Sequence, residues 1–173
     1  MKILAIDQST TCSAWSIFIG NKLEKYGSER CYTPSERKNG LPIDQRIYHM
    51  YKYLRNIIIS EKPDFIVFED TFLQKVNSPE TFAWLNRLVG CIMCLSIEHD
   101  ISYKIWQANA WRKLIGMPCG RGVKREQEKE YSVEYANKHY NLELKRKDDD
   151  LADALCMGTA YLIMNEKKGE KES

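Results

Sequence analysis

The sequence predicts an α/β fold in which helices cover a mixed central sheet. Short apolar segments bounded by turn residues are typical of strands, and longer segments whose apolar residues recur at intervals of three and four are typical of helices. Because both kinds occur along the chain, helices are expected on the faces of the sheet. The predicted strands are residues 2–7, 13–20, 21–32, 64–70 and 102–106.

The first three strands are expected to form a meander. Gly20 and Asn21 are typical turn residues, and they join the second strand to the third. A helix is predicted over 42–60, because apolar residues recur at helical spacing until Pro63 ends the pattern. The strand at 64–70 then follows in the manner of a crossover to a parallel neighbour.

Four more helices are predicted in the second half of the chain. Ser78 as a cap and Pro79 at the first helical position indicate a helix over 79–98. The tail at 166–173 is charged and poor in apolar residues, so we expect it to be disordered after a single domain at 1–165. The other predicted helices are 107–116, 123–139 and 149–165.

Composition narrows the possible classes of protein. The 173 residues fit one domain, and the formal net charge of +2 means that any basic surface for nucleic acid must be local. No long apolar run or signal peptide is evident, which predicts a cytoplasmic protein without a membrane segment. The six cysteines are scattered, and Cys91 and Cys94 lie in an apolar run, so we interpret them as reduced side chains rather than zinc ligands.

Acidic side chains lie at the ends of three separate elements. Asp7 ends the first strand, Glu69 lies at the end of the fourth, and "KDDDLADAL" opens the last helix. Such ends can converge in an α/β sheet, and several carboxylates are what a site for two Mg²⁺ ions requires. The alternative is structural, with a turn residue, a strand-end charge and helix-capping acids. A charged side chain at the end of an apolar strand costs free energy unless another group compensates it, so Asp7 and Glu69 favour the metal site over the structural alternative.

Helical geometry separates the acids of the last helix. At about 100° per residue, Asp150 and Asp153 border the apolar stripe that faces the sheet. Asp149 points away from that stripe, so Asp148 or Asp149 is the better cap. Asp150 and Asp153 are therefore the pair expected to point toward a metal ion.

Three motifs together resemble RuvC-type Holliday-junction resolvases of the RNase H-like superfamily: "LAIDQSTTCSAWSIF", "PDFIVFEDTF" and "DDDLADAL". The resemblance extends over residues 2–163. It implies a five-stranded RNase H-like sheet flanked by helices, and a homodimer that cuts symmetrically related strands of four-way branched DNA. It leaves open whether the protein comes from a cell or a phage, and which DNA sequence it prefers.

The resemblance also implies a chemistry. The catalytic acids and metal ligands would be Asp7, Glu69, Asp150 and Asp153, and the metal would be Mg²⁺, which Mn²⁺ can replace. We expect two ions in the site, with Asp7 shared between them. These ions would activate a water and stabilise the leaving 3′ oxygen, giving 5′-phosphate and 3′-hydroxyl ends. Lys124 would balance charge in the transition state, and no nucleotide cofactor is needed.

DNA contacts follow from the same resemblance. Phe72 matches an aromatic side chain that reaches the junction centre, and its alternative is an ordinary packed residue. For the basic residues the alternative is solvated surface charge. The implied contacts to the DNA backbone are Arg112, Lys113, Arg121, Lys124 and Arg125.

The motifs depart from those of the family at two places. Gln8-Ser9 stands where the family has a Pro-Gly turn, and Ala14 where it has glycine.

"IDQSTT" also resembles the phosphate hairpin of sugar kinases and actin-like ATPases, but these need two large lobes and a second phosphate loop. A branched-DNA nuclease of broader specificity, or a non-catalytic junction-binding module, remains an alternative.

The homodimer is expected to form through the helix at 79–98. Its apolar stripe extends beyond what one sheet should need, and Gly90 would allow a close approach. The stripe consists of Phe82, Leu85, Val89 and Ile92, with Trp84 and Leu88 adding apolar surface.

Overall fold

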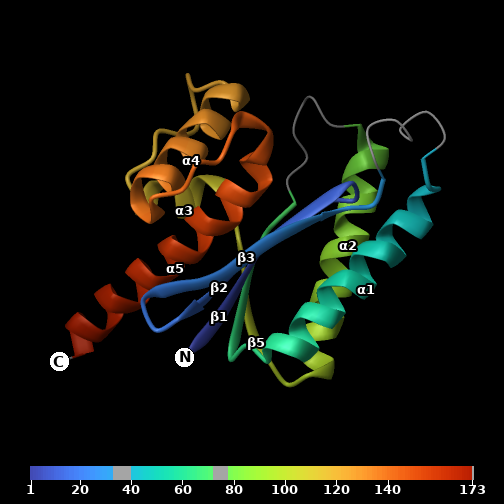
Figure 1. The fold of residues 1–173 in the computed structure, drawn as a ribbon, viewed down its shortest axis with the longest axis horizontal. Coiled ribbons are helices and arrows are strands. Elements are labelled where there is room, and N and C mark those ends of the chain that lie inside the picture. Colours follow the sequence, from blue (N-terminus) through green and yellow to red (C-terminus); the bar gives the residue numbers. More distant parts are fainter. Residues whose placement is uncertain (33–39, 72–77, 173) are drawn as a thin grey trace.

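The computed structural model describes residues 1–32, 40–71 and 78–172. A central sheet has the strand order β3-β2-β1-β4-β5 (Figure 1). The strands are β1 (Lys2–Asp7), β2 (Cys12–Ile19), β3 (Lys22–Arg30), β4 (Phe65–Glu69) and β5 (Ser102–Trp106). The helices are α1 (Ile43–Glu61), α2 (Pro79–Glu98), α3 (Ala108–Leu114), α4 (Arg125–Tyr140), the short 3-10 helix η2 (Arg146–Asp148) and α5 (Asp149–Glu172).

Strand pairing brings the ends of β1 and β4 to one edge of the sheet. β1 is antiparallel to β2, where Asp7 pairs with Ala14, so the opening hairpin forms with Gln8-Ser9 in its turn. β1 is parallel to β4, and β4 is parallel to β5. The mixed five-stranded sheet and the opening meander are therefore confirmed. Asp7 and Glu69 end two neighbouring parallel strands.

Helices cover the two faces of the sheet, as Figure 1 shows: α1 and α2 lie on one face, and α5 lies on the other with α3 and α4. Alternation along the strands sends successive side chains to opposite faces. On β1, Leu4 and Ile6 pack in the core under α1 and α2. Ile3 and Ala5 pack in the second core, under α5.

α5 packs closely against β2 at Gly158. A Cβ atom added there would lie 2.2 Å from Cε2 of Phe18, so only glycine fits. One turn earlier, the Ser16 hydroxyl donates a hydrogen bond of 2.9 Å to the carbonyl oxygen of Ala154. These contacts fix the height of α5 over the sheet, and so the position of the acids in its first turns.

The last helix is longer than predicted. α5 extends to Glu172, beyond the helix end predicted at residue 165. Glutamate and lysine have high helix propensity, which extends a helix that packing has already nucleated. In addition, the Asn21 side chain donates a hydrogen bond of 2.6 Å to Glu166.

α2 corrects the predicted dimer stripe. Val89 and Ile92 are buried in the protein's own core, against the sheet, and so are not available to a partner. Gly90 instead has open space at its Cβ position, and Ile97 is 68% exposed. By length and composition alone α2 could cross a membrane, contrary to the expectation that no segment could, but a core helix passes the same test.

Candidate active site

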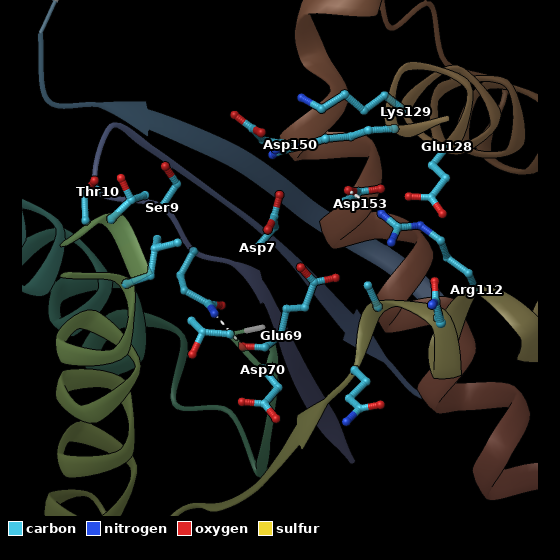
Figure 2. Close-up of a pocket in the computed structure, with 18 of the residues that line it drawn as sticks. Asp7, Ser9, Thr10, Glu69, Asp70, Arg112, Glu128, Lys129, Asp150 and Asp153 are labelled. Carbon is cyan, nitrogen blue, oxygen red and sulfur yellow. Dashed lines mark hydrogen bonds and ion pairs between the residues drawn. The ribbon is translucent and has the colours of Figure 1, made fainter. Parts of the chain in front are cut away.

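The acids predicted from sequence line one pocket of about 660 Å³ at the edge where β1 and β4 end. Asp7 comes from β1 and Glu69 from β4, while Asp150 and Asp153 come from the first turns of α5. Figure 2 shows Asp7 in the middle of this group. The remaining wall comes from the turn after β1, from α2, α3 and α4. Four carboxylates from three distant segments therefore meet in one pocket.

The neighbouring acids of α5 have other partners. The backbone N–H of Lys145 donates a hydrogen bond of 2.9 Å to Asp148, whose side chain thus caps η2. Asp149 forms an ion pair with Lys129 of α4. Neither Asp148 nor Asp149 lines the pocket. The helical phase inferred from sequence separates the two pairs of acids in the same way.

Asp7 carries the strongest electrostatic conflict in the site. Desolvation raises its pKa well above the usual range, and repulsion from Asp153, Glu69 and Asp150 raises it further. Arg112 acts in the opposite direction by attraction. Such a cluster of mutually repelling carboxylates is a good environment for a cation, because a cation would relieve the repulsion.

Glu69 is oriented by two neighbours. The indole N–H of Trp111 donates a hydrogen bond of 3.0 Å to its carboxylate, and the amide of Gln8 donates one of 2.5 Å to its backbone carbonyl. Desolvation and repulsion from Asp153 raise the pKa of Glu69 to about 7, although Arg112 and Trp111 act against the rise. Glu69 therefore changes charge near neutral pH.

Asp153 has partners on both carboxylate oxygens. Arg112 Nη2 lies 2.9 Å from Oδ2 and forms an ion pair in which both side chains are largely buried. The Ser132 hydroxyl, itself fully buried, donates a hydrogen bond of 2.5 Å to Oδ1. Burial raises the pKa of Asp153, and both of these partners lower it. Asp153 is thus held in place by α3 and α4.

Asp150 lies beside the thiol of Cys12 on β2. Desolvation and repulsion from Asp149 raise the pKa of Asp150, whereas the thiol lowers it. Burial, followed by repulsion from Asp150, raises the pKa of Cys12 to about 12, so the thiol stays protonated at neutral pH. Cys12 can therefore donate a hydrogen bond to the Asp150 carboxylate but is not a thiolate nucleophile.

The donor atoms of the pocket fit Mg²⁺ in kind. Carboxylate oxygens are the ligands that this hard cation prefers, and Asp7 has no cationic partner of its own among the described residues. In the part of the chain that the structure describes, however, no three acidic, histidine or cysteine side chains are gathered closely enough to hold one ion. Asp153 is also fully engaged by Arg112 and Ser132. The carboxylates converge without forming a complete metal cluster.

The predicted basic residues divide into two groups. Arg112 and Arg125 line the pocket, but Arg112 is only 6% exposed and is paired with Asp153 rather than lying on the surface. Lys113, Arg121 and Lys124 are exposed and do not line the pocket. Lys124 lies at the N-cap of α4, outside the carboxylate group. Phe72 lies outside the described residues.

Sequence reasoning missed several residues that shape the site. Four of them contact an acid of the pocket region from a helix or strand that is distant in sequence. A short sequence motif cannot reveal such contacts, because the two partners are far apart along the chain. The missed residues are Cys12, Trp111, Lys129 and Ser132, together with Gln8 and Glu128 in the wall of the pocket.

Comparison with known proteins identifies the fold. No family model matches the sequence. Nor does any curated protein sequence match it. Among solved structures, Thermus thermophilus RuvC in complex with Holliday junction substrate is similar, with a TM-score of 0.73, 12% identity and 96% of each chain covered.

Two further structures agree with this result. A second Thermus thermophilus RuvC structure has a TM-score of 0.70 and 14% identity, with 97% of each chain covered. The yeast mitochondrial Holliday junction resolvase has a TM-score of 0.57 and 14% identity over 93% of this chain and 77% of its own. The predicted fold class is confirmed: the chain has the RNase H-like fold of RuvC.

Proposed function

We propose that this protein is a metal-dependent endonuclease that resolves four-way DNA junctions by paired nicking. The observation that carries the proposal is the convergence of Asp7, Glu69, Asp150 and Asp153 in one pocket. Its support is the fold, which is shared with a RuvC structure that holds Holliday junction substrate. Several carboxylates in one polar pocket are what hydrolysis of a phosphodiester with divalent metal ions requires.

Asp7, Glu69 and Asp150 are the residues that would hold two Mg²⁺ ions. Mn²⁺ would be able to replace Mg²⁺ there. When bound, the metal would supply an activated water and stabilise the leaving 3′ oxygen, so the products would be 5′-phosphate and 3′-hydroxyl ends. Asp153 would enter the ligand set only if it exchanged a contact to Arg112 or Ser132, since both of its oxygens are engaged. We therefore assign Asp153 first to fixing the pocket.

The chain's other groups position the acids and the DNA. Trp111 orients the Glu69 carboxylate, and Arg112 compensates part of the negative charge around Asp7. Arg125, at the pocket wall, would contact the phosphate being cut or its neighbour. The exposed Lys113, Arg121 and Lys124 would contact the DNA backbone outside the pocket, and Lys124, which precedes Arg125 in the chain, would balance negative charge in the transition state. Phe72 remains proposed as the side chain that reaches the junction centre.

A homodimer completes the proposal, because two symmetrically related strands must be cut. The exposed side of α2 supplies a face for it: Gly90 has open space at its Cβ position, and Arg87, Cys94 and Ile97 are exposed on the same side. Helices can approach closely where a glycine lies at the crossing. Specificity for branches would then come from the spacing of two pockets across the dimer.

A cleavage assay tests the proposed function. A synthetic four-way junction, a forked duplex and a linear duplex of the same sequence are each incubated with the protein in Mg²⁺, Mn²⁺ or EDTA. We expect Mg²⁺-dependent, paired nicks in the junction and none in the linear duplex. Equal cutting of forks would indicate a nuclease of broader specificity, binding without cutting would indicate a junction-binding module, and ATP binding without DNA binding would indicate a nucleotide site.

A further inference from the structure

A second pocket, of about 270 Å³, adjoins the carboxylate pocket at the first turns of α1 and α2. Thr10 and Thr81 line both pockets, so the two form one continuous depression. Its wall also contains Ile43, Arg46, Glu80 and Trp84. The carboxylate pocket therefore opens toward a site that contains an arginine and a tryptophan.

Arg46 is a half-buried cation in this second pocket. Among the described residues it forms no ion pair, and its buried Nε atom has no hydrogen-bond acceptor. Glu80 lines the same pocket but lies on its exposed rim and is not paired with Arg46. Arg46 thus lines the pocket without a paired carboxylate among the described residues, and a guanidinium in such a place can donate hydrogen bonds to the oxygens of a phosphate.

Trp84 supplies a flat apolar surface beside Arg46. The guanidinium of Arg87 lies 3.9 Å from the centre of the indole ring, which restrains the ring in its position. Trp84 is only half-buried. An indole of this kind can stack on any nucleobase, since every base has an aromatic face.

Thr10 and Thr81 connect the two pockets by hydroxyl groups without adding charge. Thr81 is exposed, and its hydroxyl lies 3.0 Å from that of Ser78. Neutral hydroxyls can donate hydrogen bonds to phosphate oxygens, whereas the acids of the first pocket would repel a phosphate that carries no metal. The path from the acids to Arg46 thus runs from negative through neutral to positive groups.

We propose that the second pocket holds a nucleotide of the DNA strand being cut, next to the one at the carboxylates, with Arg46 on its phosphate and Trp84 against its base. This assignment rests on the proposed nuclease function and specifies where the strand lies. A nucleic-acid strand fits both walls at once, because it carries a phosphate and an aromatic base in each repeating unit.

The test is the binding of a fluorescent four-way junction in EDTA, measured by anisotropy over a range of salt concentrations. Arg46→Ala should weaken binding about tenfold through loss of a charged hydrogen bond. It should also reduce the slope of log affinity against log salt by about 0.7–0.9, the effect of one lost phosphate contact. Trp84→Ala should weaken binding about fivefold or more without changing that slope.

Matched variants separate this site from general surface charge. Arg55→Ala removes an arginine from the same helix outside both pockets, and it should keep the wild-type affinity and slope. Arg46→Lys should keep the slope but lose affinity, and Trp84→Phe should recover most of the binding. Circular dichroism establishes that each variant is folded.

The inference is overturned if Arg46→Ala keeps both the affinity and the slope of the wild type, or if Arg55→Ala changes them equally. It is also overturned if Trp84→Ala binds normally. A wild-type protein that neither binds nor cuts junctions would instead reject the proposed nuclease function, and the nucleotide site with it. If the wild type cuts junctions and the Arg46 and Trp84 variants bind them as the wild type does, only the nucleotide site is rejected.

Discussion

Arg112 and Asp153 form an ion pair in the wall of the carboxylate pocket, with 2.9 Å between Nη2 and Oδ2. The side chains are 7% and 15% exposed, so water screens the pair little. The charge of Arg112 also lowers the pKa values of Asp7 and Glu69. One buried arginine thus stabilises the charged forms of at least three acids.

Arg112→Ala should therefore destabilise the fold. Removing one partner of a buried pair leaves the other charge uncompensated, which costs about 3–5 kcal/mol in the free energy of unfolding. Arg112→Lys keeps the charge and should lose less. Denaturation in guanidinium chloride at pH 7.5 measures the difference, and a loss below about 1 kcal/mol for the alanine variant would contradict a buried, unscreened pair.

The acids of α5 should differ sharply in their effect on cleavage. Asp150→Asn removes a charged pocket group of similar shape, so we expect Mg²⁺-dependent cutting to be lost while junction binding, which rests on lysine and arginine, is kept. Asp148→Asn should be nearly silent, because the amide oxygen of asparagine can still accept the hydrogen bond from the Lys145 backbone N–H and the side chain does not line the pocket. Asp149→Asn breaks the pair with Lys129 and should cost some stability but little activity.

A cleavage time course of these three variants, each first measured for folding by circular dichroism, gives the comparison. Asp153→Asn belongs in the same series and should be severe for both activity and stability, because it removes the partner of Arg112 and weakens the contact to Ser132. An inactive Asp149→Asn beside an active Asp150→Asn would refute the assignment.

The stability of the metal-free protein should depend on pH through Glu69. Its pKa rises to about 7 on folding from an unfolded value near 4.5. Between these values the folded state binds more protons than the unfolded state, so the free energy of unfolding should fall as pH rises. Asp7, Asp150 and Asp153 have raised pKa values as well and act with the same sign.

Chemical denaturation in EDTA at pH 5, 6, 7 and 8 should show this fall, and Glu69→Gln should reduce it. Bound Mg²⁺ requires the deprotonated acids, so added metal should stabilise the protein more at pH 8 than at pH 6. A stability that rises steadily over this range in EDTA would contradict the raised pKa values.

The acids could be predicted from sequence because their signal is local. Asp7 and Glu69 interrupt apolar strands at their ends, and the spacing of Asp150 and Asp153 follows from one helical repeat. The sheet was predictable for a similar reason, since strand-length apolar segments alternate with turn residues. The acids and the strands can both be recognised from a few consecutive residues of the sequence.

The contacts that tune the site could not be predicted in this way. Arg112 lies in a seven-residue helix, too short for periodicity to fix which side is buried, and its partner Asp153 is 41 positions away. On α2, apolar side chains surround much of the helix, so the pattern could not decide whether Val89 and Ile92 face the sheet or a partner. Both outcomes depend on tertiary neighbours.

Gly158 should be essential to the placement of α5. In Gly158→Ala the new methyl group would lie 2.2 Å from Phe18, and relief of the clash would displace the helix or the ring. Overpacking of a core costs about 1–3 kcal/mol, which exceeds the gain in helix propensity of about 1 kcal/mol from glycine to alanine. The double variant Phe18→Leu with Gly158→Ala should recover part of the loss. Thermal denaturation of both variants and of Phe18→Leu alone checks this, and simple additivity of the two changes would contradict the contact.

The exposed side of α2 should control the oligomeric state and the outcome of cleavage. Ile97→Glu places a charge on a side chain that is 68% exposed in the single chain, so it should not disturb folding but should weaken a dimer that covers it. Ile19→Glu, at a site that is 47% exposed at the end of β2, is the matched control and should remain dimeric. Sedimentation velocity reports the mass, and a plasmid with an extruded cruciform reports the paired cut. We expect linear plasmid from the wild type and the control but nicked circles from Ile97→Glu, because a monomer has one carboxylate pocket and so can cut one strand at a time. A wild-type monomer that still yields linear plasmid would show that paired nicking does not need this face.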